Sequence, residues 1–115
     1  MTERSRGRVL LLGSEGMGRG DDRLGSTILR SFLQTLVANP LRPETIICWN
    51  AGVKLLVAPS PVLEVLQQLE GVGVEILACK TCVEHFALSE TLKAGQISTM
   101  PVISDLLLRG EVLTV

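Results

Sequence analysis

The chain passes from an apolar run into a helical pattern within Val74-Glu75-Ile76-Leu77-Ala78-Cys79-Lys80-Thr81-Cys82-Val83-Glu84-His85-Phe86. Residues 74–78 predict a strand, and residues 81 to about 88 predict the helix that follows it. Two cysteines, Cys79 and Cys82, lie at the junction. A buried strand that leads directly into a helix is typical of a parallel sheet, because parallel neighbours need crossover connections.

The same alternation runs through the rest of the chain. Strands are predicted at 8–12, 45–49, 74–78, 96–99 and 111–115. Helices are predicted at 24–37, 61–71, 81–88 and 101–110, with a short irregular or one-turn segment at 53–58 and a further helical turn at 89–95. The pattern predicts an α/β fold: a three-layer α/β/α domain with a five-stranded, mainly parallel sheet and flavodoxin/Rossmann-like topology.

Local signals refine the helices. Asp21 or Asp22 is expected to cap the first helix, since a carboxylate there accepts free backbone N–H groups. Pro61 is expected at the first position of the second helix, where its missing N–H does no harm. In the last helix the residues expected to face inward are Val102, Ile103, Leu106 and Leu107.

Length and composition bound the possibilities. The 115 residues suit one domain, 1–115, with residues 1–7 (including Arg4 and Arg6) as a flexible, solvated lead-in. The chain is 46% hydrophobic but only 3% aromatic, so its core is expected to consist of Leu, Val, Ile and Ala. A net charge of −1 offers no basic surface for nucleic acid or membrane. No apolar run approaches a membrane span, and no secretory pattern opens the sequence, so a cytoplasmic location is expected.

The cysteines are the first candidates for chemistry. In the cytoplasm they are expected to be thiols. Cys79 and Cys82 straddle a helix start, where free N–H groups and the helix dipole stabilise a thiolate and lower its pKa. The alternative is that both are small buried hydrophobic residues. Cys48, within a strand and next to Trp49, is expected to fill the core.

A metal or haem site is not expected. Cys79, Cys82 and His85 supply three ligands, and no second C-x-x-C or histidine pair completes a tetrahedral zinc site. Covalent haem attachment needs C-x-x-C-H, but Val83 occupies the histidine position. We therefore expect no cofactor. His85 is either a proton carrier near the thiols or a plain surface histidine.

Other loops also follow strands. The carboxyl ends of parallel strands meet at one edge, where ligands bind. The loop at 13–20 and Asn50-Ala51-Gly52 should therefore approach Cys79 and form the walls of its pocket. The residues expected there are Ser14, Glu15, Gly16, Met17, Gly18, Asn50 and Gly52. The glycines match neither G-x-G-x-x-G nor the P-loop, so the 13–20 loop is either a small-anion site or a structural turn.

Several motifs together resemble the DsrE/DsrF-like proteins, most closely the C-terminal domain of YedF-type (sulfurtransferase-like selenium metabolism) proteins. They are Ser14-Glu15-Gly16-Met17-Gly18-Arg19-Gly20-Asp21, Leu24-Gly25, Asn50-Ala51-Gly52-Val53-Lys54-Leu55, Ser60-Pro61-Val62-Leu63, and Gly73-Val74-Glu75-Ile76 before Cys79-Lys80-Thr81-Cys82. The resemblance runs from about Val9 to the C-terminus.

The resemblance implies a parallel five-stranded fold and assembly into dimers, trimers or larger rings. It also implies that Cys79 carries a persulfide in a sulfur relay, whereas Cys82 matches a cysteine present in only some branches. The sequence departs from the family in two ways. It lacks the TusA-like carrier domain usual in YedF-type proteins, and Ala87 stands where a glycine is expected.

The leading hypothesis is therefore an oligomeric sulfur (or selenium) carrier rather than a turnover enzyme, with persulfide on Cys79 and Cys82 as a resolving thiol. Its partners would be a sulfur donor and an acceptor such as a TusA-like carrier. One alternative is a regulatory module that binds a small ligand or anion at the strand carboxyl edge. Another is a dithiol redox protein that uses Cys79 and Cys82.

Overall fold

Strands and helices alternate along residues 7–115, which the computed structural model describes. The strands are β1 (Arg8–Leu12), β2 (Thr45–Cys48), β3 (Glu75–Cys79), β4 (Gln96–Ser98) and β5 (Glu111–Thr114). The helices are α1 (Asp22–Val37), α2 (Leu63–Gly71), α3 (Lys80–His85) and α4 (Met100–Arg109), together with the 3₁₀ helix η2 (Asn50–Leu56).

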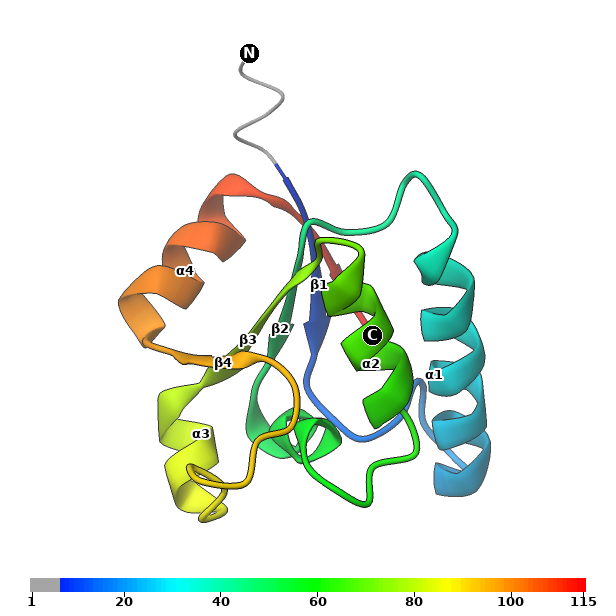
Figure 1. Ribbon diagram of the computed structural model, residues 1–115, viewed down its shortest axis with the longest axis horizontal. Coiled ribbons are helices and arrows are strands. Elements are labelled where there is room, and N and C mark those ends of the chain that lie inside the picture. Colours follow the sequence, from blue (N-terminus) through cyan, green and yellow to red (C-terminus); the bar gives the residue numbers. More distant parts are fainter. Residues whose placement is uncertain (1–6) are drawn as a thin grey trace.

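The five strands form one sheet in the order β4-β3-β2-β1-β5, and every neighbouring pair is parallel. Helices α1 and α2 cover one face and α4 covers the other (Figure 1). The larger core lies on the α1–α2 face and includes Leu10, Ile46 and Ile76; the smaller core lies on the α4 face around Val9, Ile47 and Ile103. The predicted three-layer α/β/α fold is confirmed.

The strand register brings the functional loops to one edge. Leu12 pairs with Cys48, Cys48 with Ala78, and Cys79 with Ser98, so β1, β2, β3 and β4 end nearly side by side. Helices η2 and α3 both lie at this carboxyl edge (Figure 1). From β1 the chain adds β2, β3 and β4 on one side of β1 and then crosses to place β5 on the other side, so the strand order reverses at β1. In open α/β sheets such a switch point is where ligands bind.

Some predicted helix boundaries are wrong. Helix α2 begins at Leu63, because the N–H of Leu63 bonds to the carbonyl of Ser60 three residues back, which makes this segment a turn before the helix. Helix α3 ends at His85 rather than near Leu88, because Phe86 and Ala87 turn the chain out of the helix.

Two further predictions on the second half of the chain are wrong. The segment 89–95 forms turns and bends instead of a helical turn, because Lys93 N–H bonds to the carbonyl of Leu56 and Gly95 N–H bonds to the Glu70 carboxylate. In α4, Ile103 is fully buried as expected, but Val102 is 48% exposed, since it faces away from the sheet.

The cap on α1 is as predicted: the Asp21 carboxylate accepts the N–H of Leu24 at 2.9 Å. The expected lead-in with Arg4 and Arg6 lies outside the described residues, except for Gly7, whose carbonyl accepts the N–H of Glu111 at 3.1 Å. Among the helices of residues 7–115, none is both long and apolar enough to cross a membrane.

Candidate functional site

Cys79 is the last residue of β3 and directly precedes α3. Its neighbour Ala78 faces the α1–α2 core, so alternation along the strand turns Cys79 to the opposite face. There it packs in the smaller core with Val9, Leu11, Ile47 and Ile103, and only 3% of it is exposed. In the described structure the sulfur of Cys79 is therefore enclosed by apolar side chains.

Cys82 lies in α3, one turn after Cys79. It is partly buried and packs against both cores, so it lies between the two faces of the sheet. Its Sγ accepts the backbone N–H of Asn50 at 3.0 Å. Cys82 also packs against the smaller core, which contains Cys79, so the two cysteines expected to carry the chemistry lie in one cluster.

The pKa of Cys82 is raised above its ordinary value. Burial is the main cause, because it disfavours the thiolate. The N–H of Asn50 acts in the opposite direction, since it stabilises a negative sulfur. The hydrogen bond and the charge of Cys79 both raise the pKa further.

The backbone around η2 fixes the N–H of Asn50. Asn50 has φ of +51°, in the left-handed region that asparagine tolerates better than most residues. Two residues later, Gly52 packs its backbone onto the end of β1, where a Cβ would overlap the carbonyl of Leu12. Strand β1 thereby holds η2, and η2 presents one N–H to the sulfur of Cys82.

The third cysteine fits its predicted role as core filler. Cys48 is completely buried on the α1–α2 face, and burial raises the pKa of its thiol to about 12. It is separated from Cys79 because the two side chains point to opposite faces of the sheet.

His85 is exposed on the last turn of α3. Its ring contacts Phe86 edge to face, with 4.9 Å between ring centroids. The Lys54 ammonium lies 4.5 Å from the Phe86 centroid, so η2 and the end of α3 are also joined by a cation–π contact. No hydrogen bond links His85 to either thiol among the bonds of the described chain.

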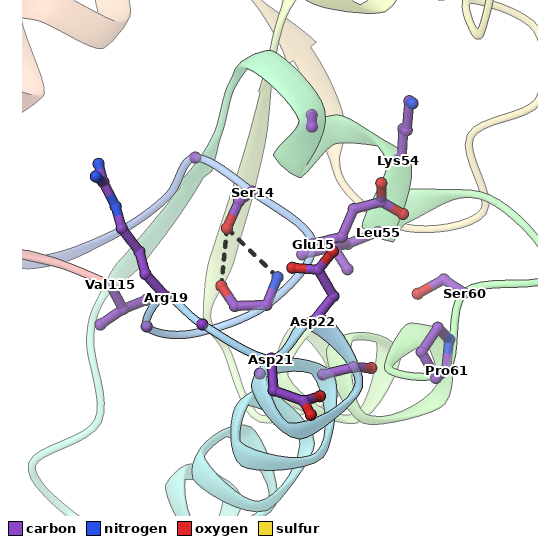
Figure 2. A pocket seen from close by; sticks show the side chains of 17 residues that line it. Ser14, Glu15, Arg19, Asp21, Asp22, Lys54, Leu55, Ser60, Pro61 and Val115 are labelled. Carbon is purple, nitrogen blue, oxygen red and sulfur yellow. Dashed lines mark hydrogen bonds between the residues drawn. The ribbon is translucent and has the colours of Figure 1, made fainter.

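A separate cavity of about 820 Å³ opens at the switch point between β1 and β5. The loop after β1, the start of α1, part of η2 and Val115 after β5 line it. The carboxylates of Glu15 and Asp22 lie near its centre, whereas Arg19 and Lys54 extend outward (Figure 2). Ser14 Oγ bonds within the loop to the carbonyl of Gly16 at 2.8 Å.

The predicted pocket residues divide between two places. The cavity is lined by Ser14, Glu15, Gly16 and Gly18. Met17 packs against the larger core, and its N–H bonds to the carbonyl of Gly25. Asn50 lies at the thiols, whereas Gly52 packs against β1. The loop shares the carboxyl edge with the two cysteines, but Met17 of the loop packs on the α1–α2 face, Cys79 lies on the α4 face, and Cys82 lies between them.

Sequence reasoning missed several neighbours of these groups. Trp49 packs against the core that contains Cys79 and was considered only as a neighbour of Cys48. Because neighbouring side chains along a strand point to opposite faces, the position of Trp49 next to the core residue Cys48 indicated the face on which Cys79 lies. Lys54, Ser60, Pro61 and Val115 line the cavity and were not singled out as a ligand site. Within residues 7–115, no three His, Cys, Asp or Glu side chains gather closely enough to hold a metal ion.

No family model and no curated protein sequence matches the chain. Solved structures do. The ychN protein from E. coli is 15% identical, with a TM-score of 0.68 over 96% of this chain and 99% of that one. MTH1491 from Methanobacterium thermoautotrophicum, a protein of unknown function, is 17% identical, with a TM-score of 0.67 over 94% and 98%.

BT1422 from Bacteroides thetaiotaomicron, a conserved protein of unknown function, is 19% identical, with a TM-score of 0.67 over 100% of this chain and 98% of that one. Each match covers nearly the whole of both chains, so the similarity extends to the complete arrangement of strands and helices. At these identities the likeness concerns the fold, and the chain shares its α/β fold with all three proteins.

Proposed function

We propose that this chain is a DsrE/DsrF-like sulfur carrier of YedF type, in which the Cys79–Cys82 pair takes up sulfur as a persulfide and passes it on. The observation that carries the proposal is that Cys79 and Cys82 lie in one cluster at the strand carboxyl edge, with a backbone N–H directed at Cys82. A pair that only filled the core would not need that donor. The motif resemblance and the shared fold add support.

The chemistry needs only thiols. A thiolate of the pair attacks the outer sulfur of a donor persulfide, R–S–SH, to form a protein persulfide and release R–S⁻. An acceptor thiolate then attacks the outer sulfur of the protein persulfide and regenerates the protein thiolate. The chain returns to its starting state, so it acts as a carrier. Selenium would follow the same steps.

Mass spectrometry after incubation with a cysteine desulfurase and cysteine tests the proposal. We expect the protein to gain one sulfur atom, and a variant with both Cys79→Ser and Cys82→Ser to gain none. The peptide that contains Cys48 is an internal control, since that thiol is completely buried. A wild-type protein that gains no sulfur under conditions that load another carrier would overturn the function.

A second candidate is a regulatory module that binds a small ligand. The cavity of about 820 Å³ favours it, because that volume suits a small molecule and lies at a switch point. Thermal shift with phosphate, nucleotides and amino acids is the test. Stabilisation that persists in the double cysteine variant would support this function independently of the thiols.

A dithiol redox protein would use the same cysteine pair. Its signature is a reversible Cys79–Cys82 disulfide, which differential alkylation in oxidising and reducing buffer detects. An unchanged alkylation pattern would contradict this third function. For the carrier we further propose assembly into a homo-oligomer, with a donor protein and a TusA-like acceptor as partners.

A further inference from the structure

We infer that Cys82 is the sulfur that receives the transferred atom, and that Cys79 is the thiol that afterwards displaces it. This order reverses the one expected from the sequence, where Cys79 carries the persulfide. The inference rests on the proposed function and assigns a role to each sulfur within it.

Access is the first argument. A donor persulfide has to approach the attacking sulfur directly, so reaction depends on how far that sulfur is exposed. Cys79 is 3% exposed and enclosed by Val9, Leu11, Ile47 and Ile103. Reaching it from outside requires displacing side chains of the smaller core. Cys82 is partly exposed and lies on α3 at the carboxyl edge, where a donor reaches it without such unpacking.

The hydrogen bond from Asn50 is the second argument. Its N–H lies 3.0 Å from Cys82 Sγ, and the N–H of Asn50 is fixed by the packing of η2 on β1. An N–H directed at sulfur stabilises the negative charge that develops when Cys82 leaves as a thiolate, which happens when an acceptor removes the outer sulfur. The N–H of Asn50 therefore favours transfer of the outer sulfur from Cys82 to an acceptor.

The position of Cys79 relative to Cys82 gives Cys79 its role. Cys82 lies one helical turn after Cys79 and packs against the core that contains it, so Cys79 is placed to attack the inner sulfur of Cys82 once Cys82 is a persulfide. In the absence of an acceptor, the Cys79 thiolate attacks this inner sulfur: the Cys79–Cys82 disulfide forms, the S–S bond to the outer sulfur breaks, and the outer sulfur leaves as HS⁻. The sulfane sulfur gains two electrons from the dithiol. A small-molecule thiol reductant then restores both thiols.

The test maps sulfur by peptide mass spectrometry at short times after mixing with a cysteine desulfurase and cysteine. In the wild type the first persulfide is expected on the peptide at Cys82, followed by the disulfide and free sulfide. Cys79→Ser should keep its sulfur on Cys82 and form no disulfide. Cys82→Ser should gain sulfur at least tenfold more slowly than the wild type.

The outcomes separate the two proposals. If Cys82→Ser loads Cys79 at the wild-type rate, or if the earliest wild-type persulfide lies on Cys79, the assigned order is wrong while the carrier function stands. If the wild type gains no sulfur, the carrier function itself is wrong. The early wild-type time points need no variant, so a variant that folds poorly does not prevent the decision.

Discussion

At Cys82, Asn50 and Cys79 act in opposite directions on one sulfur. The N–H of Asn50 lowers its pKa, whereas Cys79 raises it through a hydrogen bond and through charge. We expect Cys79→Ala to lower the pKa of Cys82, because both influences disappear and the sulfur becomes better solvated. The midpoint of the iodoacetamide rate of Cys82 against pH should move to lower pH.

A matched control exists for this titration. Cys48→Ala also removes a thiol, but Cys48 lies in the core on the α1–α2 face and makes no hydrogen bond to Cys82. The midpoint should therefore stay at its wild-type position in Cys48→Ala. A midpoint that stays in place, or rises, in Cys79→Ala would contradict the role assigned to Cys79.

The buried thiol of Cys48 makes stability depend on alkaline pH. Its pKa is about 12 in the folded protein against 9.0 for a free thiol. Between these values the unfolded chain has released the proton and the folded chain has kept it, so the free energy of unfolding falls as pH rises. The difference between the two pKa values corresponds to a total loss of about 4 kcal/mol in unfolding free energy. Below pH 9 both states keep the proton, so the thiol does not make stability depend on pH.

Urea unfolding at neutral pH and at points between 9 and 12 measures this slope. The comparison is Cys48→Ala, which has no thiol at this position and retains every other titrating group. In this alkaline range, we expect the unfolding free energy of the wild type to fall with pH more steeply than that of the variant, by about 1.4 kcal/mol per pH unit. Equal slopes in the two proteins would show that the thiol is not protected in the folded chain.

Ala87 adopts a conformation that suits glycine. Its φ is +57°, which costs an L-residue about 1–2 kcal/mol. It follows α3, where Ala87 N–H bonds to the carbonyl of Glu84 and Leu88 N–H bonds to that of Val83. This is the Schellman arrangement, which usually has glycine at the left-handed position. Ala87, which replaces the glycine expected from the family resemblance, therefore occupies a position whose backbone conformation favours glycine.

We expect Ala87→Gly to stabilise the protein by about 1 kcal/mol, because relief of strain exceeds the added flexibility of the unfolded chain. Urea unfolding gives the difference in free energy. Ala38→Gly is the control: Ala38 follows α1 with φ of −101°, where glycine only adds flexibility. If both glycine variants are destabilised alike, Ala87 carries no strain.

At the scale of elements, η2 joins the end of β1 to the thiols. A Cβ at position 52 would overlap the Leu12 carbonyl, so Gly52→Ala has to push η2 away from the sheet. We expect a loss of about 3 kcal/mol or more in unfolding free energy, in the range of severe overpacking. The Asn50–Cys82 bond should weaken with it, which alkylation of Cys82 at fixed pH would register.

Gly71→Ala is the matched glycine variant. Gly71 ends α2, and a Cβ there meets nothing within 4 Å. It should therefore leave stability unchanged or raise it by up to about 1 kcal/mol, since alanine favours a helix. A Gly52→Ala protein as stable as Gly71→Ala would mean that η2 adjusts freely and does not fix the N–H at Cys82.

The sequence predicted the strands well because each is a short apolar run bounded by polar or turn residues. Strand β1 matches residue for residue, and the Asp21 cap was predicted from its side chain. The start of α2 was mispredicted, because the backbone bond from Leu63 N–H to the Ser60 carbonyl forms a turn where the proline rule predicts the first helical turn. Segment 89–95 depends on Glu70 and Leu56, which are distant in sequence.

The sequence predicted which edge of the sheet carries the candidate site, but not the face of the sheet to which each side chain points. Strand-end position correctly indicated that the loop after β1, η2 and Cys79 share the carboxyl edge. The face to which a side chain points depends on the strand register and on the exact residue at which the strand ends, because a shift of one residue reverses the face. That single-residue detail puts Cys79 on the α4 face, away from the cavity around Glu15 and Asp22.

At the scale of the whole molecule, β5 forms an edge of the sheet and carries exposed apolar side chains. Strand β5 lies outside β1 and is exposed throughout, with Leu113 53% exposed. Glu111 donates its N–H to the carbonyl of Gly7, just before β1, and Val115 donates its N–H to that of Leu11 in β1. Alternation therefore turns the N–H and C=O of Val112 and Thr114 outward. Beside this edge lies an apolar groove of about 320 Å³ lined by Phe32, Leu36, Leu41 and Leu113, among others.

Such an edge favours pairing with another strand unless proline, lysine or a bulge protects it. Strand β5 contains neither proline nor lysine. Two copies related by a two-fold axis can pair their β5 strands antiparallel, because the outward groups of Val112 and Thr114 are both donors and acceptors. That pairing also brings the two Leu113 side chains together over the groove. We therefore expect the protein to self-associate through β5.

Sedimentation velocity at micromolar concentration measures this association. The wild type should sediment as a dimer or larger species, and Leu113→Lys should weaken association about tenfold or more, because like charges would then face each other across the pairing. Leu108→Lys, at a site 87% exposed on α4, removes an equally apolar side chain away from β5 and should leave association intact. A monomeric wild type would contradict self-association, whereas equal association of all three proteins would exclude β5 as its surface.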